Sequence, residues 1–214
     1  MPPPAELCTT QTAMPPAAKR SLLIIGSLLA VMWGVELLDW VGGRWLELDQ
    51  FGIIPRRMSG LLGIPLEPFL HAGWSHLAAN TLPFAILGLL VLGRGVRTFW
   101  TVSAGIVVWG GFAVWLLGRG QVVHVGASGL TFGYFGYLVA LGVIERSLAS
   151  MLRALMVGLF YGSIIWGVLP NHRGVSWESH LFGLLAGVAM ACIPGRVSVR
   201  RRDGSNGVVH SDGS

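Results

Sequence analysis

Long apolar runs separated by short polar connections dominate this sequence. The runs cover residues 21–40, 73–93, 98–118, 127–144, 152–169 and 177–193. Each is close to the ~20 residues that an α-helix needs to cross the hydrocarbon core of a bilayer. The pattern therefore predicts an all-α polytopic membrane protein with six transmembrane helices.

The segments outside these runs divide the chain into three parts. Residues 1–18 are rich in Pro, Ala and Thr and predict a disordered N-terminal tail, and residues 196–214 predict a basic, flexible C-terminal tail. Between them, residues 19–195 form the membrane domain. The first run follows two basic residues, as in a signal peptide, but it is long and lacks a small-x-small cleavage site, so we expect an uncleaved helix.

The first connection, residues 41–70, differs from the others. Charged residues and prolines interrupt it too often for a membrane crossing, yet it is too apolar for an ordinary soluble loop. We expect a large, structured first loop that is partly immersed in the bilayer.

Composition excludes several classes of protein. Hydrophobic residues make up 53% of the 214 positions and charged residues only 12%, against about 25% charged residues in an average soluble domain. A soluble globular enzyme and a disordered chain are both excluded. The net charge of +5 comes from basic residues scattered between apolar runs, without a DNA-reading motif, so nucleic acid is not an expected partner. The two cysteines lack metal or redox spacing, and we expect no metal and no cofactor.

The basic residues also predict the orientation of the chain. Alternate connections place ten Lys and Arg residues on one side of the membrane and five on the other. The side with ten is predicted to be cytoplasmic, which puts both termini inside. The runs 73–93, 127–144 and 177–193 then all enter from the outer face. The oligomeric state stays open.

These three runs carry polar residues at one depth. His76 and Asn80 lie in the first two turns of one run, Ser128 begins the next, and His180 lies in the first turn of the last. Ionisable groups inside a membrane are costly and usually face a cavity. Each residue alone could be an interhelical hydrogen bond that stabilises the bundle, but the whole set favours a site reached by water.

The chemistry of this layer points to a nucleophilic serine. Ser128 follows the small residues Gly126 and Ala127 at a predicted helix start, where N–H groups suit a developing oxyanion. Its hydroxyl needs a base, and His180 is the candidate. Glu178 is two residues from His180 and points elsewhere on a helix, so we expect a Ser–His dyad rather than a triad. His124 is nearer in sequence, but we expect it at the membrane surface and solvated.

Small residues would let the two helices of the dyad approach closely. The small-xxx-small pattern consists of Gly129 and Gly133 in one run and of Gly183 and Gly187 in the other. Such patterns permit close backbone contact, although they also occur in ordinary helix packing. Phe132, one turn after Ser128, could stack on the ring of His180.

Together these motifs resemble the rhomboid intramembrane serine proteases, in the basic six-helix bacterial form. The likeness is carried by His71-Ala-Gly-Trp-Ser-His76-Leu-Ala-Ala-Asn80, by Gly126-Ala-Ser128-Gly129 and by Ser179-His180-Leu-Phe-Gly183-Leu-Leu-Ala-Gly187. The resemblance implies that Ser128 is the nucleophile and His180 the general base. It also implies that His76 and Asn80 help to form the oxyanion hole.

Further positions carry roles that the same resemblance implies. His71 would tie the first loop to the helices, and Phe132 stands where the family often has Tyr. Two positions depart from the family pattern: Pro55-Arg56-Arg57-Met58 occupies the region of a Trp-Arg pair, and Ser179 replaces the usual Ala before the histidine.

The resemblance implies an intramembrane serine endopeptidase, located in the bacterial inner membrane, that cleaves transmembrane segments of other membrane proteins. Substrates would unwind locally, because backbone already hydrogen-bonded in a helix is poorly exposed to attack. The loop 171–176 is expected to lie over the site and to move with the end of the preceding helix. A non-catalytic relative that binds transmembrane helices is the alternative, although such relatives typically lack the Ser or the His. A small transporter would show internal repeats, which this sequence lacks.

Overall fold

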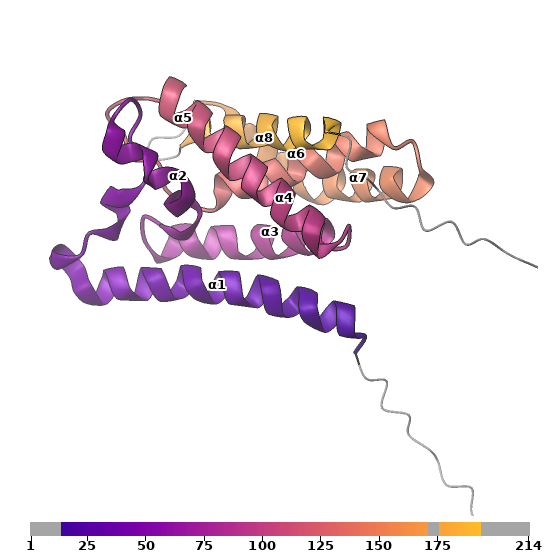
Figure 1. Ribbon diagram of the computed structural model, residues 1–214, viewed down its shortest axis with the longest axis horizontal. Helices are drawn as coiled ribbons and strands as arrows, with labels where there is room; N and C mark the ends of the chain where they lie inside the picture. The colour runs from indigo at the N-terminus through magenta and orange to yellow at the C-terminus, as the bar shows by residue number, and fades with distance from the viewer. Residues whose placement is uncertain (1–13, 171–175, 194–214) are drawn as a thin grey trace, which may run out of the picture.

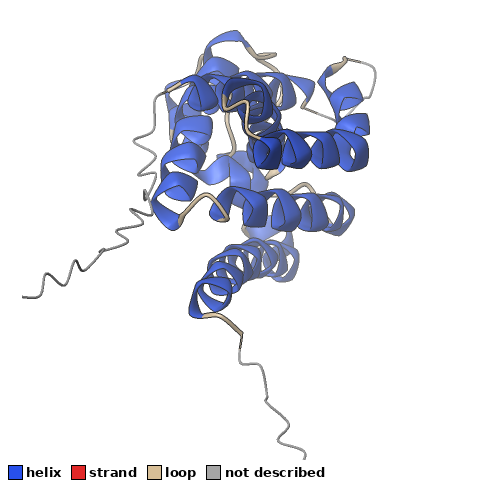
Figure 2. Ribbon diagram, turned by 90° about the vertical axis from the view of Figure 1, so that its right-hand side faces the viewer, coloured by secondary structure: helices blue, strands red, loops and turns tan. Residues whose placement is uncertain are grey.

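The computed structural model describes residues 14–170 and 176–193, so both predicted tails lie largely outside it, as does most of the loop 171–176. The described part is built from helices (Figures 1 and 2), and its one β-type contact is an isolated bridge between Ile53 and His124. The prediction of an all-α fold is confirmed.

Six long helical segments follow the six apolar runs. They are α1 (Pro16–Gly42), α3 (Trp74–Leu92), the continuous segment α4 (Val96–Gly105), η5 (Ile106–Gly110) and α5 (Gly111–Leu117), α6 (Ser128–Ile144), α7 (Leu148–Tyr161) continued by η6 (Gly162–Val168), and α8 (Trp177–Cys192). The segment η5 is a π-helical turn, and η6 is a 3-10 helix. The first helix starts before the predicted run, within the stretch predicted to be disordered.

Four of these segments are long and apolar enough to cross a membrane. They are Pro16–Gly42, Trp74–Leu92, Val96–Leu117 and Leu148–Val168. Helix α6 is a shorter apolar helix of 17 residues, and α8 has 16. The structure therefore supports an integral membrane protein with four candidate spans among the described residues. The predicted count of six is not confirmed, because α6 and α8 are shorter than the other four segments.

Helix α6 lies in the centre of the bundle. Its residues from Ser128 to Leu138 are all buried, and it packs against α3, α7 and α8. Tyr134 fills the middle, where its ring packs against Phe84 and Phe99 and its hydroxyl lies 2.7 Å from Ser103 Oγ. By contrast, Leu159 and Phe160 on α7 are about 70% exposed, as expected for side chains that face lipid.

The first loop folds into five short helical pieces. They are η1 (Gly43–Trp45), η2 (Leu48–Phe51), η3 (Met58–Leu61), α2 (Gly63–Leu66) and η4 (Glu67–Phe69). Trp45 and Met58 are largely exposed while Ile53 is fully buried. The loop is therefore structured, with large apolar side chains on its surface and a buried contact inside, and its immersion in the bilayer stays a prediction.

Arg56 anchors this loop to the end of α5. Its Nη1 donates hydrogen bonds to the carbonyl oxygens of Gly118 at 2.8 Å and Leu116 at 3.2 Å. The indole N–H of Trp115 donates to the carbonyl oxygen of Arg57 at 2.8 Å. The Arg56 side chain and the Arg57 backbone thus anchor the loop in the region where the resemblance led us to expect a Trp-Arg pair.

Candidate active site

The structure brings Ser128 and His180 into direct contact. Ser128 is the first residue of α6 and His180 the fourth residue of α8, and the distance from Ser128 Oγ to His180 Nε2 is 2.9 Å. Each residue is only 8% exposed. A buried serine hydroxyl within hydrogen-bond distance of an imidazole nitrogen is the arrangement that activates a serine nucleophile.

Glycines set this distance by letting α6 and α8 cross closely. A Cβ added to Gly183 would overlap the carbonyl oxygen of Gly129, and one added to Gly187 would overlap that of Gly133. The close approach predicted from the small-residue pattern is therefore confirmed. Larger residues at these positions would push the helix that carries His180 away from Ser128.

The remaining nitrogen of His180 faces the backbone of η6. His180 Nδ1 lies 2.8 Å from the carbonyl oxygen of Gly167. A carbonyl oxygen only accepts, so Nδ1 carries the proton and Nε2 presents its lone pair to Ser128. The backbone of Gly167 thus orients the imidazole, the task that an aspartate performs in a Ser-His-Asp triad.

An aromatic ring supports the imidazole from the side. Phe132 stacks on His180 with ring centroids 4.1 Å apart and an interplanar angle of 7°, which confirms the predicted stack. A Cβ at Gly167 would lie 2.8 Å from Phe132 Cζ and 3.0 Å from His180 Nδ1. Gly167, Phe132 and His180 are therefore so closely packed that a methyl group at Gly167 would not fit.

His76 lies beside Ser128. Gly126 adopts a φ of +118°, which favours glycine, and a Cβ there would be 2.9 Å from His76 Nε2 and 3.7 Å from Ser128 Oγ. Asn80 is buried one turn further on, and its Nδ2 donates to the carbonyl oxygen of His76 at 3.0 Å. The structure thus places the His76 ring close to Ser128 and directs one amide N–H of Asn80 to the backbone.

His71 connects the first loop to Ala127, the residue before Ser128. Its Nε2 accepts the N–H of Ala127 at 3.3 Å. Burial lowers the pKa of His71 to about 4, with a smaller contribution from His76. The ring is therefore neutral near pH 7, as an acceptor must be.

The prediction that His124 is solvated is wrong. Its side chain is fully buried, and its Nδ1 lies 2.5 Å from Ser176 Oγ. Although residues 121–123 before it are exposed, the backbone of His124 pairs with that of Ile53 through two hydrogen bonds of 2.9 and 3.0 Å, which draws the histidine into the protein. Burial also lowers the pKa of His124. The His124 ring contacts Ser176, just before α8. The histidine in contact with Ser128 is His180.

Glu178 points away from the dyad, as expected from its place on the helix. Its carboxylate receives two hydrogen bonds from the Arg119 side chain, from Nε at 2.5 Å and from Nη2 at 3.0 Å. In the part of the chain that the structure describes, no group of three or more His, Cys, Asp or Glu residues could hold a metal ion.

Two residues near the dyad were missed from the sequence. Gly167 contacts His180 through its backbone, which no side-chain pattern reveals. Glu67 is a buried carboxylate whose Oε1 accepts the hydroxyl of Ser179 at 2.6 Å. The sequence does contain a sign of this buried carboxylate, because Glu67 is the single charged residue in the apolar stretch Ile64–Leu70.

Comparison with known proteins gives a family match and several relatives. The family model described as Rhomboid domain matches residues 60–196. An uncharacterized protein of Mycobacterium tuberculosis is 38% identical over 191 residues, which cover 86% of this chain and 79% of the relative. An uncharacterized protein of Mycobacterium leprae is 37% identical over 173 residues, or 77% and 68% of the two chains. A Bacillus subtilis protein named "Putative rhomboid protease YdcA" is 28% identical over 123 residues, or 57% and 61%.

Proposed function

Because the chain belongs to the rhomboid family, we propose that it is an intramembrane serine endopeptidase that cleaves transmembrane segments of other membrane proteins. One observation carries the proposal: Ser128 Oγ lies 2.9 Å from His180 Nε2, at the start of two closely packed helices. The name of the Bacillus subtilis relative agrees with this activity.

In the proposed reaction His180 acts first as a base and then as an acid. As Ser128 Oγ attacks the scissile carbonyl carbon, its proton passes to His180 Nε2. The carbonyl oxygen of Gly167 accepts from Nδ1–H, and the stacked ring of Phe132 faces the imidazolium that forms. His180 then gives the proton to the leaving amine, and water hydrolyses the acyl-enzyme through the same histidine.

The negative charge of the tetrahedral intermediate would develop beside the start of α6. N–H groups in the first turn of a helix have no intrahelical partner and carry positive potential. The His76 ring lies against Gly126, and Asn80 can offer its second amide N–H. These donors form the oxyanion hole of the proposal.

The proposed topology has six crossings. Helices α6 and α8, of 17 and 16 residues, complete the four longer candidates. The ten-to-five distribution of basic residues supports cytoplasmic termini. Ser128 and His180 then lie near the outer face of the bacterial inner membrane, where water is close.

The alternative of a non-catalytic protein that binds transmembrane helices gains no support. Both Ser128 and His180 are present and in contact. A binding function alone needs neither this contact nor the orientation of His180 by Gly167.

The test is cleavage of a model transmembrane substrate by the purified full-length protein in detergent. The wild type and a Ser27→Ala control, which changes an exposed serine on α1, should release the product, and Ser128→Ala should not. All three proteins should show the same thermal midpoint. Cleavage by folded Ser128→Ala, or no cleavage by the wild type on several substrates, would overturn the proposal.

A further inference from the structure

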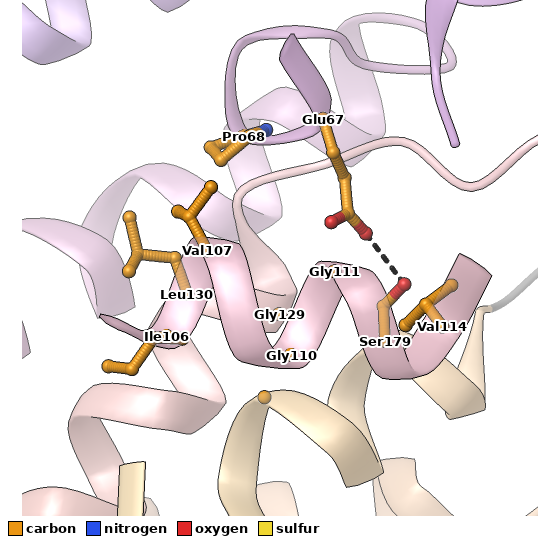
Figure 3. A pocket seen from close by; sticks show the side chains of 11 residues that line it. Glu67, Pro68, Ile106, Val107, Gly110, Gly111, Val114, Gly129, Leu130 and Ser179 are labelled. Atoms are coloured by element: carbon orange, nitrogen blue, oxygen red, sulfur yellow. Dashed lines mark hydrogen bonds between the residues drawn. The ribbon is translucent and has the colours of Figure 1, made fainter. Parts of the chain in front are cut away.

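Glu67 buries a carboxyl group behind the dyad. It belongs to η4 of the first loop and is 7% exposed. Figure 3 shows its side chain directed at Ser179, whose hydroxyl donates to Glu67 Oε1 at 2.6 Å. Ser179 immediately precedes His180, so this hydrogen bond holds the turn of α8 that carries the proposed base.

The backbone of Glu67 holds the other half of the site. Its carbonyl oxygen accepts the N–H of Gly126 at 2.9 Å. Gly126 lies two residues before Ser128 and has the φ of +118° that turns the chain into α6. One residue of the first loop therefore contacts the immediate surroundings of both the nucleophile and the base.

The hydrogen bond to Ser179 belongs to a longer chain of hydrogen bonds. Ser176 Oγ donates to Ser179 Oγ at 2.8 Å and lies 2.5 Å from His124 Nδ1. Ser176 Oγ also accepts the N–H of Ser179 at 3.3 Å and so caps α8. The chain from Glu67 to His124 thus fixes the start of α8 between the first loop and the connection before α6.

The surroundings of Glu67 are largely apolar, so the hydrogen bond from Ser179 stabilises its buried carboxyl group. Beside the two residues lies a cavity of about 10 Å³ whose other walls are uncharged, among them Pro68, Val107 and Val114. This volume holds about one water molecule, so the cavity does not accommodate a substrate. A buried carboxyl group in such walls is costly without a hydrogen bond.

The acceptor oxygen of Glu67, rather than its charge, makes the contact. Burial raises the pKa of Glu67 to about 7, and the hydroxyl of Ser179 lowers it by less. Near neutral pH both forms are populated, and both accept a hydrogen bond from Ser179. A glutamine, with the same shape and an amide oxygen, should therefore replace it.

We propose that Glu67 is a positioning residue for the dyad, which holds His180 against Ser128 through Ser179 and the start of α8. This role rests on the proposed protease function. Nothing in it requires contact between Glu67 and the substrate, so its loss should lower kcat and leave KM nearly unchanged.

The experiment compares Glu67→Gln, Glu67→Leu, Ser179→Ala and the double variant Glu67→Leu/Ser179→Ala. We expect Glu67→Gln to keep kcat within about threefold of the wild type. The two other single variants should each lower kcat about 10- to 100-fold, since a displacement near 1 Å costs about 10²-fold. The double variant should be no worse than the poorer single variant, because the two residues share one interaction.

A second readout is the rate at which a fluorophosphonate labels Ser128, which reports the dyad without a substrate. It should fall in parallel with kcat, and Gln50→Leu, an exposed change in the same loop, should alter neither. If Glu67→Leu does not fold, Ser179→Ala still tests the positioning role, because it removes only one hydroxyl oxygen.

The failures are distinguishable. An active wild type with equally active Glu67→Leu and Ser179→Ala overturns the positioning role alone. Equal losses in Glu67→Gln and Glu67→Leu also overturn it, because the acceptor would then not suffice. A wild type that neither cleaves nor labels overturns the proposed protease and the positioning role with it.

Discussion

Replacing Gly167 with alanine would perturb the dyad from the side opposite to Ser128. The added methyl group would lie 2.8 Å from Phe132 Cζ and 3.0 Å from His180 Nδ1. Carbon contacts are optimal at about 3.5–4.0 Å, so the two rings or the η6 backbone must move by about 0.5–1 Å. Movement of the rings would lengthen the 2.9 Å contact with Ser128, and movement of η6 would weaken the 2.8 Å contact with Nδ1.

A misplacement of about 1 Å in a catalytic group costs about 10²-fold in rate, or about 2.7 kcal/mol of transition-state stabilisation. We therefore expect Gly167→Ala to lower kcat about 10²-fold with little change in KM. The assay is steady-state cleavage of a model transmembrane substrate in detergent, together with the rate of fluorophosphonate labelling.

Two neighbouring glycines provide matched controls. Gly158 in α7 and Gly162 at the start of η6 have nothing within 4 Å of an added Cβ. Gly158→Ala and Gly162→Ala should therefore keep kcat within about twofold, with thermal midpoints at or above that of the wild type, because alanine favours helix. Wild-type kcat in folded Gly167→Ala would refute the role given to the Gly167 backbone.

Three further changes test other parts of the site and the topology. His124→Ala should lower the free energy of unfolding by about 2–4 kcal/mol, because it empties a buried position and removes a partner of Ser176. The folded variant should keep kcat within about fivefold of the wild type, and a folded but inactive variant would contradict this. Asn80→Ala should lower kcat about 10²–10³-fold at constant KM if its amide binds the oxyanion, and an unchanged kcat would exclude that role. With both native cysteines replaced, Ala149→Cys should react with an impermeant thiol reagent only from the cytoplasmic side and Gln121→Cys only from outside; labelling from one side would reject the proposed orientation.

Side-chain patterns along single helices predicted the parts of the structure that depend on local sequence. The apolar runs predicted the helices, and the glycine spacing predicted the close crossing of α6 and α8. The stack of Phe132 on His180 followed from their positions in these two helices. Periodicity and helix geometry suffice for such features.

Contacts between distant segments were not predictable in the same way. The Gly167 carbonyl group carries no side-chain signal, and its contact with His180 depends on where η6 ends. A polar residue in a short connection is expected to be solvated, but the backbone of His124 pairs with Ile53 and its side chain is fully buried. Glu67 is absent from the residues predicted for the site, because its contact with Ser179 spans 112 residues.

The most direct test of the central claim is to identify the residue that a fluorophosphonate modifies in the full-length wild-type protein. Mass spectrometry of the labelled protein should find one adduct, on the peptide that contains Ser128, and His180→Ala should abolish it without loss of folding. His180 is the predicted proton acceptor of Ser128, so its loss should leave the hydroxyl unreactive. No adduct, an adduct on another residue, or undiminished labelling of Ser128 in His180→Ala would contradict the Ser128–His180 dyad.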